Sequence, residues 1–86
     1  MSQRDFTEGA DSELARLKQF VDAMPYKEQN VTKLWFGIGD GYRYTLSEIA
    51  AIFKSDVLEM DDYIGRIEKK LGKAGLLVIA QQHGRA

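Results

Sequence analysis

Carboxylates gather near the middle of the chain, where their spacing suits either a helix start or a binding surface. They are Asp56, Glu59, Asp61 and Asp62. Acidic side chains in the first turns of a helix complement its dipole, each by about 0.3–1 kcal/mol. The functional alternative is a surface that repels phosphate or binds a basic partner. The two interpretations are compatible, and both argue against a strong contact with DNA.

Basic residues follow this acidic cluster and could contact phosphate. They are Arg66, Lys69, Lys70 and Lys73, with His83 and Arg85 beyond them. Cations near the C-terminus of a helix also complement its dipole, and a pI of about 5.8 lacks the basic footprint of an independent DNA-binding domain. We therefore favour a solvated helix face, with phosphate contact as the alternative.

The residues that catalysis would need are missing or badly placed. His83 is the only histidine, and there is no cysteine. Asp61 and Asp62 are adjacent, and adjacent positions on a helix point apart. Because no metal-ligand spacing occurs either, the sequence predicts a protein that is not an enzyme and has no cofactor. Trp35 beside Phe36 could stack on a base, but their helical spacing favours core packing.

Composition limits the chain to one small domain. It has 86 residues, 44% of them hydrophobic, and 12 basic side chains nearly balance 13 acidic ones. The longest apolar run, residues 76–80, is too short to span a bilayer, and the N-terminal residues lack the apolar stretch of a secretory signal. We therefore expect a cytoplasmic protein that does not associate with membranes.

Apolar residues recur at helical spacing in four segments, and these helices must position the charged side chains. The expected helices lie near residues 11–24, 25–36, 45–53 and 55–72. Residues 1–10 are expected as a flexible lead-in, 11–74 as the helical domain and 75–86 as a C-terminal extension or tail. Within that tail, residues 76–80 could form a strand, a packed extension or an exposed partner surface, and residues 81–86 an end that frays.

Local signals mark the helix ends and the core. Asp11 or Ser12 and, later, Ser55 are candidate N-caps, Thr45 and Glu48 have the spacing of a capping box, and Pro25 suits the first turn of the second helix. The crowded glycines at 37, 39 and 41 predict a turn with positive φ. The expected core residues are Leu17, Val21, Val31, Leu34, Ile49, Phe53, Ile64 and Ile67.

Residues 20–53 resemble region 4 of bacterial sigma factors of the housekeeping type. Residues 24–28 read Met-Pro-Tyr-Lys-Glu, residues 31–41 read Val-Thr-Lys-Leu-Trp-Phe-Gly-Ile-Gly-Asp-Gly, and residues 45–53 read Thr-Leu-Ser-Glu-Ile-Ala-Ala-Ile-Phe. The family reads L-P-x-R-E, V-x-x-L-R-F-G-L-x-D-G and T-L-E-E-I-G-x-x-F, in the same order. The segment from Arg66 to Leu71 looks like the end of the family's recognition helix.

The resemblance implies a four-helix domain that contains a helix-turn-helix. In sigma factors the recognition helix of this domain reads the minus-35 promoter element, and another surface holds the flap tip of the polymerase β subunit. The present chain has no counterpart of sigma regions 2 or 3, so the resemblance does not imply promoter opening.

Two departures concern the recognition helix. From Phe53 to Glu68 the chain runs fifteen residues where the family has eleven, and Lys54 stands where the turn glycine belongs. We predict that the added residues lengthen the fourth helix at its start; the alternative is a longer loop with the helix beginning near Met60. In addition, the three arginines of the family's T-R-E-R-I-R-Q-I-E segment become Asp61, Tyr63 and Gly65.

We therefore expect a sigma region 4-like, transcription-associated protein that acts mainly through contact with RNA polymerase or a sigma-related regulator. The matched segment indicates partner-binding residues Lys27, Glu28, Lys33, Trp35 and Phe36. One alternative is a sequence-specific DNA-binding regulator of minus-35-like elements, with Tyr63, Arg66, Lys69 and Lys70 as readers. Another is a structural module that forms a homodimer through the run from Leu76 to Ala80.

Overall fold

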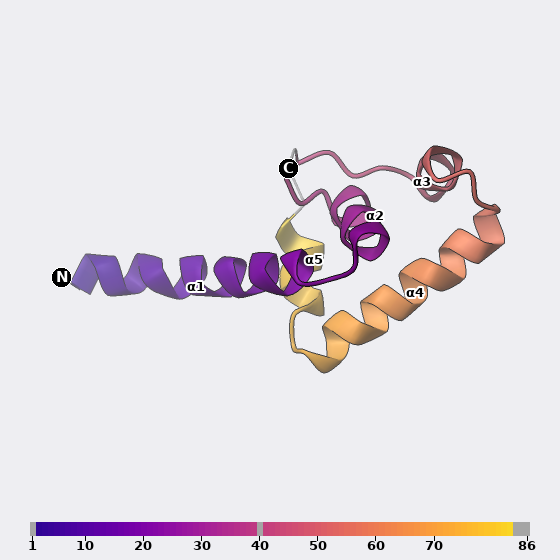
Figure 1. The fold of residues 1–86 in the computed structure, drawn as a ribbon. Helices are drawn as coiled ribbons and strands as arrows, with labels where there is room; N and C mark the ends of the chain where they lie inside the picture. The colour runs from indigo at the N-terminus through magenta and orange to yellow at the C-terminus, as the bar shows by residue number, and fades with distance from the viewer. Residues whose placement is uncertain (1, 40, 84–86) are drawn as a thin grey trace.

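The computed structural model describes residues 2–39 and 41–83, and this part of the chain has an all-α fold. Its five helices are α1 (Ser2–Asp22), α2 (Tyr26–Phe36), α3 (Leu46–Ile52), α4 (Val57–Lys73) and α5 (Leu77–His83). Figure 1 shows α2 and α5 beside the C-terminal end of α1 and α3 and α4 farther from it, while the rest of α1 extends away from the other helices. The expected all-α class is confirmed, with one helix more than the sequence predicted, and the expected helix-turn-helix stays a prediction.

The first helix is longer than expected. It begins at Ser2, so residues 2–10, predicted as a loose lead-in, are helical, and Asp11 and Ser12 lie inside the helix instead of capping it. The segment contains no proline and several residues that tolerate a helix. Residues 2–10 show no apolar residues at helical spacing, because Phe6 is their only large apolar residue, and the sequence therefore did not predict a helix there.

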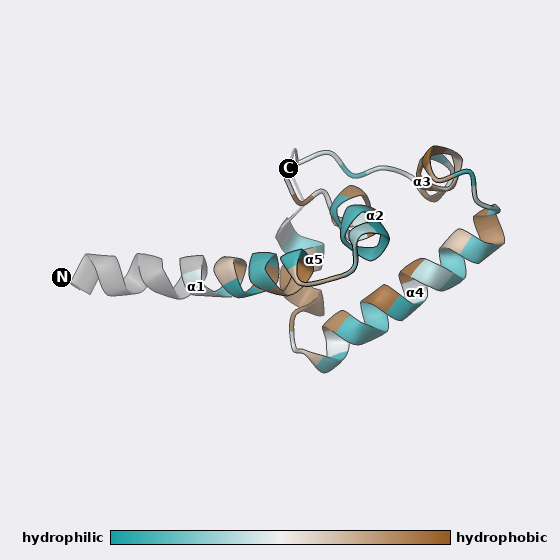
Figure 2. Ribbon diagram, in the orientation of Figure 1, coloured by the Kyte–Doolittle hydropathy of each residue, from teal (hydrophilic) through white to brown (hydrophobic). Residues whose placement is uncertain are grey.

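The core lies where α1, α2, α4 and α5 meet and continues beneath α3. Six of the eight expected core residues are buried, whereas Leu34 and Phe53 are only partly buried and pack against the cluster from its edge. Figure 2 shows apolar and polar residues alternating along α4 with a helical period. The buried residues of that helix are Met60, Ile64, Ile67 and Leu71.

The capping box at the start of α3 is confirmed. The backbone N–H of Glu48 donates to Thr45 Oγ1 at 3.1 Å, and the backbone N–H of Thr45 donates to Glu48 Oε1 at 2.8 Å. Two N–H groups that the helix start would otherwise leave unsatisfied are thereby paired.

Replacing Thr45 with alanine should therefore cost about 1 kcal/mol of unfolding free energy, within the range of about 0.5–2 kcal/mol for lost N-caps. Urea denaturation of the Thr45→Ala variant measures this loss. Ser47→Ala, an exposed change on the same helix, is the matched control, and equal losses from both variants would contradict the capping role.

The turn between α3 and α4 contains a lysine in a left-handed backbone conformation. Lys54 has φ of 53°, the only positive φ at a non-glycine position among the described residues, and it occupies the place assigned to the family's turn glycine. A lysine there is less favourable than glycine, because its Cβ crowds the backbone. The hydrogen bond from the Ser55 N–H to the Ala50 carbonyl, at 2.8 Å, closes the turn.

The added residues lengthen α4 at its start, as predicted. The helix begins at Val57, so the alternative start near Met60 is wrong. The N-cap position belongs to Asp56, and the Ser55 hydroxyl, expected to cap the helix, donates instead to the Asp56 carbonyl at 3.2 Å. A one-residue shift of this kind is common at helix ends.

Residues 76–80 could form a strand, a packed extension or an exposed partner surface, and in the structure they form a packed extension that is helical from Leu77 onward. Leu76 and Ala80 are buried, Leu77 and Ile79 pack against the core, and only Val78 is largely exposed. The reversal from α4 to α5 uses Gly75 at φ of 75°. Of residues 81–86, the expected frayed end, residues 81–83 belong to α5 instead. Residues 84–86 lie outside the described residues, as do Met1 and Asp40.

Candidate functional site

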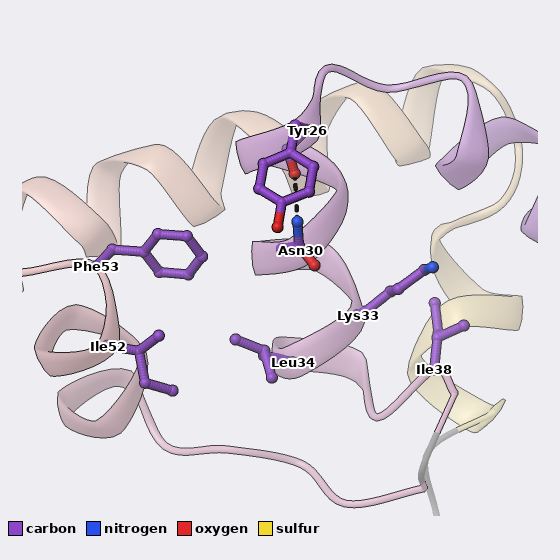
Figure 3. Close-up of a pocket in the computed structure, with 7 residues that line it drawn as sticks. All are labelled: Tyr26, Asn30, Lys33, Leu34, Ile38, Ile52 and Phe53. Carbon is purple, nitrogen blue, oxygen red and sulfur yellow. Dashed lines mark hydrogen bonds between the residues drawn. The ribbon is translucent and has the colours of Figure 1, made fainter.

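An open groove lies between α2 and the end of α3, beside the turn that leads into α4 (Figure 3). Its volume is about 420 Å³. The residues lining it are Tyr26, Asn30, Lys33, Leu34, Ile38, Ile52 and Phe53. Two segments of the sigma-like stretch, residues 25–38 and 45–53, therefore form its two walls.

Apolar side chains from both walls face one another across the groove. Leu34 from α2 points toward Ile52 and Phe53 at the end of α3 (Figure 3). Ile52 is 52% exposed and Tyr26 is 81% exposed, which is unusual for large apolar residues that face the same depression. The groove therefore exposes apolar side chains from both of its walls.

Polar groups occur only at the rim of the groove. Asn30 Nδ2 donates to the carbonyl of Tyr26 at 2.8 Å, which fixes the amide at the upper end (Figure 3). Lys33 Nζ lies 3.7 Å from Asp22 Oδ1 at the other end, a loose pair whose groups both reach solvent. Exposed pairs of this kind contribute little to stability, so Lys33 can turn toward an acceptor on a bound partner.

The opposite side of α2 is held to α4 by three polar contacts. Lys70 Nζ pairs with Glu28 Oε2, Lys27 Nζ lies 4.9 Å from the centre of the Tyr63 ring, and Trp35 Nε1 donates to Glu68 Oε2 at 3.2 Å. Partial burial raises the pKa of the Tyr63 phenol, and the charge of Glu28 raises it further. These contacts fix the relative position of the two helices.

The five residues expected to bind a partner do not form one surface. Phe36 is fully buried and belongs to the core, as its spacing favoured. Lys27, Glu28 and Trp35 face α4, where each already has a partner. Lys33 alone among them lines the groove. The contacts with α4 join residues up to 42 positions apart, and such pairing leaves no signal in a local pattern.

The four residues named as DNA readers all lie on α4, and three of them are already engaged. Tyr63 lies under Lys27, Lys70 pairs with Glu28, and Arg66 forms an ion pair with Asp62 one turn earlier. The hydrogen bond to Asp62 raises the pKa of the Arg66 guanidinium. Lys69 is exposed and, among the described residues, has no ion pair.

The first half of α4 presents an acidic and apolar face to solvent. Asp56, Glu59 and Asp61 are exposed and form no ion pair within residues 2–39 and 41–83. Leu58 is 77% exposed between them. An added Cβ at Gly65 would meet no atom within 4 Å, so this face stays open as far as Arg66.

Neither a metal site nor a membrane-spanning helix is found among the described residues. Across the part of the chain that the structure describes, no three potential metal ligands gather. No described helix combines the length and apolar character that crossing a bilayer requires. His83 is the last residue of α5, far along the chain from the groove.

Of the seven groove residues, sequence reasoning named only Lys33 as a site residue. It expected Leu34 and Phe53 in the core and assigned no site role to the other four, which are Tyr26, Asn30, Ile38 and Ile52. A signal for Ile52 existed, because it falls outside the stripe of Leu46, Ile49 and Phe53 and so had to lie at the edge of the core. Tyr26 and Asn30 could be recognised only once α2 and α3 were placed together. Comparisons of the chain with protein-family models, with curated proteins and with solved structures gave no match.

Proposed function

We propose that this protein is a sigma region 4-like, transcription-associated protein that acts mainly by binding another protein, with the flap of RNA polymerase or a sigma-related regulator as its partner. The observation that carries the proposal is the groove, whose walls are the two segments that resemble the family and whose lining is largely apolar. Grooves between helices commonly bind an apolar segment of a partner.

The charge of α4 supports a protein partner over DNA. No Lys or Arg occurs from Val57 to Gly65, and this is the part of a recognition helix that enters the major groove. Its exposed carboxylates would face the phosphates there. A tight complex with DNA would therefore have to form against electrostatic repulsion.

Sequence-specific DNA binding remains the alternative, and one observation favours it. Lys69 is exposed without an ion pair among the described residues, and Arg66 lies one turn before it beside an exposed Asp62. Exposed ion pairs are weak, so phosphate could take Arg66 from Asp62. The homodimer alternative has less support, because Leu76 and Ala80 are buried within the monomer.

Variants in the groove test the proposal. We expect the wild-type chain to bind purified RNA polymerase or its isolated β-flap domain in a biolayer interferometry assay, and Ile52→Ser and Tyr26→Ala to weaken that binding about tenfold each, because both remove apolar contact area. Both side chains are more than half exposed, so the fold should tolerate the changes.

Val78→Ser is the matched control, since Val78 is 61% exposed on α5 and does not line the groove. Binding by this variant should equal that of the wild type. Groove variants that bind the polymerase as well as the wild type does would refute the groove as the contact. If the wild-type chain bound neither polymerase nor any sigma-related protein, the function itself would be refuted.

A further inference from the structure

A second exposed apolar surface lies at the corner where α3 leads into α4. It consists of Val57 and Leu58, which are 40% and 77% exposed in the first turn of α4. Figure 2 shows brown, apolar residues both on α3 and at the start of α4. We call Val57 and Leu58, with the flanking Asp56, Glu59 and Asp61, the α4 corner.

Val57 continues the buried stripe of α4, but Leu58 is not explained by the packing of that helix. The stripe that α4 buries consists of Met60, Ile64, Ile67 and Leu71. Leu58 lies half a turn from that stripe, on the side that faces solvent. The fold would accept a polar residue at this position. Together with the partly exposed Val57, Leu58 therefore gives the start of α4 apolar surface that the monomer does not bury.

The charges around Leu58 select the chemistry of that contact. Asp56, Glu59 and Asp61 are exposed and lack ion pairs within the described residues, whereas Asp62 is paired with Arg66. Asp61 lies one turn from Leu58 on the same side of the helix, and exposed carboxylates beside an apolar side chain complement a segment that carries cations beside an apolar centre. Phosphate groups, whether of nucleic acid or of an anionic lipid surface, would be repelled by the same carboxylates.

We propose that the α4 corner is a docking surface for a basic amphipathic segment of a partner protein, in which apolar side chains cover Val57 and Leu58 and Lys or Arg side chains pair with Asp56, Glu59 and Asp61. This surface is separate from the groove and does not depend on the identity of the partner that binds there. None of the residues of the α4 corner lines the groove.

The proposal can be tested with synthetic peptides and the full chain. The probe is a fluorescein-labelled 18-residue amphipathic helix built from Leu and Lys, and fluorescence anisotropy measures its binding. A Leu/Glu peptide of the same pattern reverses its charge, and a Lys/Ser peptide of the same charge lacks its apolar side. We expect the Leu/Lys peptide to bind at least tenfold more tightly than either control.

Two variants of the protein separate the apolar and charged contributions. Leu58→Ser should weaken binding of the Leu/Lys peptide about tenfold at both 50 and 500 mM salt, because apolar contacts are not screened by salt. Asp56→Asn with Asp61→Asn should weaken it about tenfold at 50 mM salt and much less at 500 mM. Val78→Ser, an exposed apolar position on α5, and Glu13→Gln, an exposed acid on α1, should leave binding unchanged.

The outcomes that overturn the proposal are specific. Equal binding by Leu58→Ser and Val78→Ser would show that the peptide does not use the corner. Equal or tighter binding of a generic DNA duplex or of anionic phosphatidylserine vesicles would assign the face to phosphate. The groove variants Ile52→Ser and Tyr26→Ala are measured against RNA polymerase, whereas the α4 corner is measured against peptides. Failure of the polymerase assay therefore does not affect the peptide assay, and failure of the peptide assay does not refute the proposed function.

Discussion

Replacing Ile49 with alanine is expected to lower the free energy of unfolding by about 2–5 kcal/mol. Ile49 is fully buried in α3, and the change removes buried methyl groups and leaves a cavity that the helices fill only in part. Folded domains have about 5–15 kcal/mol of stability in total. A change of this size should therefore bring the protein close to unfolding at ambient temperature, as urea denaturation followed by circular dichroism would measure.

The same helix supplies the control. Ile52 lies one turn away and is 52% exposed, so Ile52→Ala removes far less buried area from the same secondary structure. We expect it to change the stability by no more than about 0.5 kcal/mol, the usual size of a surface substitution. Ile67→Ala, at a buried position of α4, should resemble Ile49→Ala. A loss below about 1 kcal/mol at either buried position would contradict the packing of α3 and α4.

Elements with an unbroken apolar period could be predicted from the sequence, and α4 is the best example. Met60, Ile64, Ile67 and Leu71 recur without interruption and all are buried. The extra turn at its start followed from the same stripe, because Val57 continues it. The start of α3 could also be predicted, from its capping box. The side chains of Thr45 and Glu48 each accept a hydrogen bond from the other residue's backbone N–H, and this depends only on the local sequence.

Elements without a period could not be predicted. In α5 the apolar residues follow one another directly, and a continuous apolar run fits a buried helix, a strand or a partner surface equally well. Its helical form depends on packing against α1, α2 and α4. The helix over residues 2–10 could not be predicted for the opposite reason. These residues include almost no apolar side chains, so no apolar stripe could indicate a buried side.

The candidate site depends on contacts between distant residues, and those were beyond sequence reasoning. Apolar spacing and Pro25 predicted α2 correctly as a helix, but which of its sides is free depends on the pairing of Glu28 with Lys70 and of Trp35 with Glu68. Both pairings leave the opposite side, with Leu34 and Lys33, to form the groove with α3. The acidic stretch, in contrast, was recognised from the sequence because its members are close together in the chain.

Converting Asp61 and Asp62 together to arginine should turn a weak DNA binder into a measurably stronger one. The unmodified protein is expected to bind a minus-35-type duplex no more tightly than the non-specific range of roughly 10⁻⁴ to 10⁻⁶ M at physiological salt. Both carboxylates are exposed, so the fold should tolerate the change. Circular dichroism of the variant would verify that it is helical.

The structure makes this variant more informative than the sequence alone suggested. Asp62 holds Arg66 in an ion pair, so its replacement removes a repulsive charge and also frees a cation one turn further along α4. Each additional phosphate contact should steepen the dependence of log affinity on log salt by about 0.9 units. Fluorescence anisotropy at two salt concentrations measures both the affinity and this slope.

A charge-matched control separates the position of the new cations from their number. Glu13→Arg combined with Gln81→Arg and Gln82→Arg changes the net charge by the same amount at exposed positions on α1 and α5. Because these positions lie outside α4, the control should gain less affinity than the α4 variant. Equal gains would mean that net charge alone governs binding and that the front of α4 has no special role.

The wild-type protein decides between the two leading interpretations of α4. Where the sigma pattern has arginines that meet base edges and phosphates, this chain has Asp61, Tyr63 and Gly65, and each lost base contact removes about 1–3 kcal/mol of discrimination between sequences. We therefore expect equal, weak binding to a minus-35-type duplex and to its scrambled counterpart. Nanomolar binding of one promoter sequence, with the scrambled duplex ignored, would mean that Arg66, Lys69 and Lys70 read DNA in spite of their acidic neighbours, and the preference for a protein partner would be wrong.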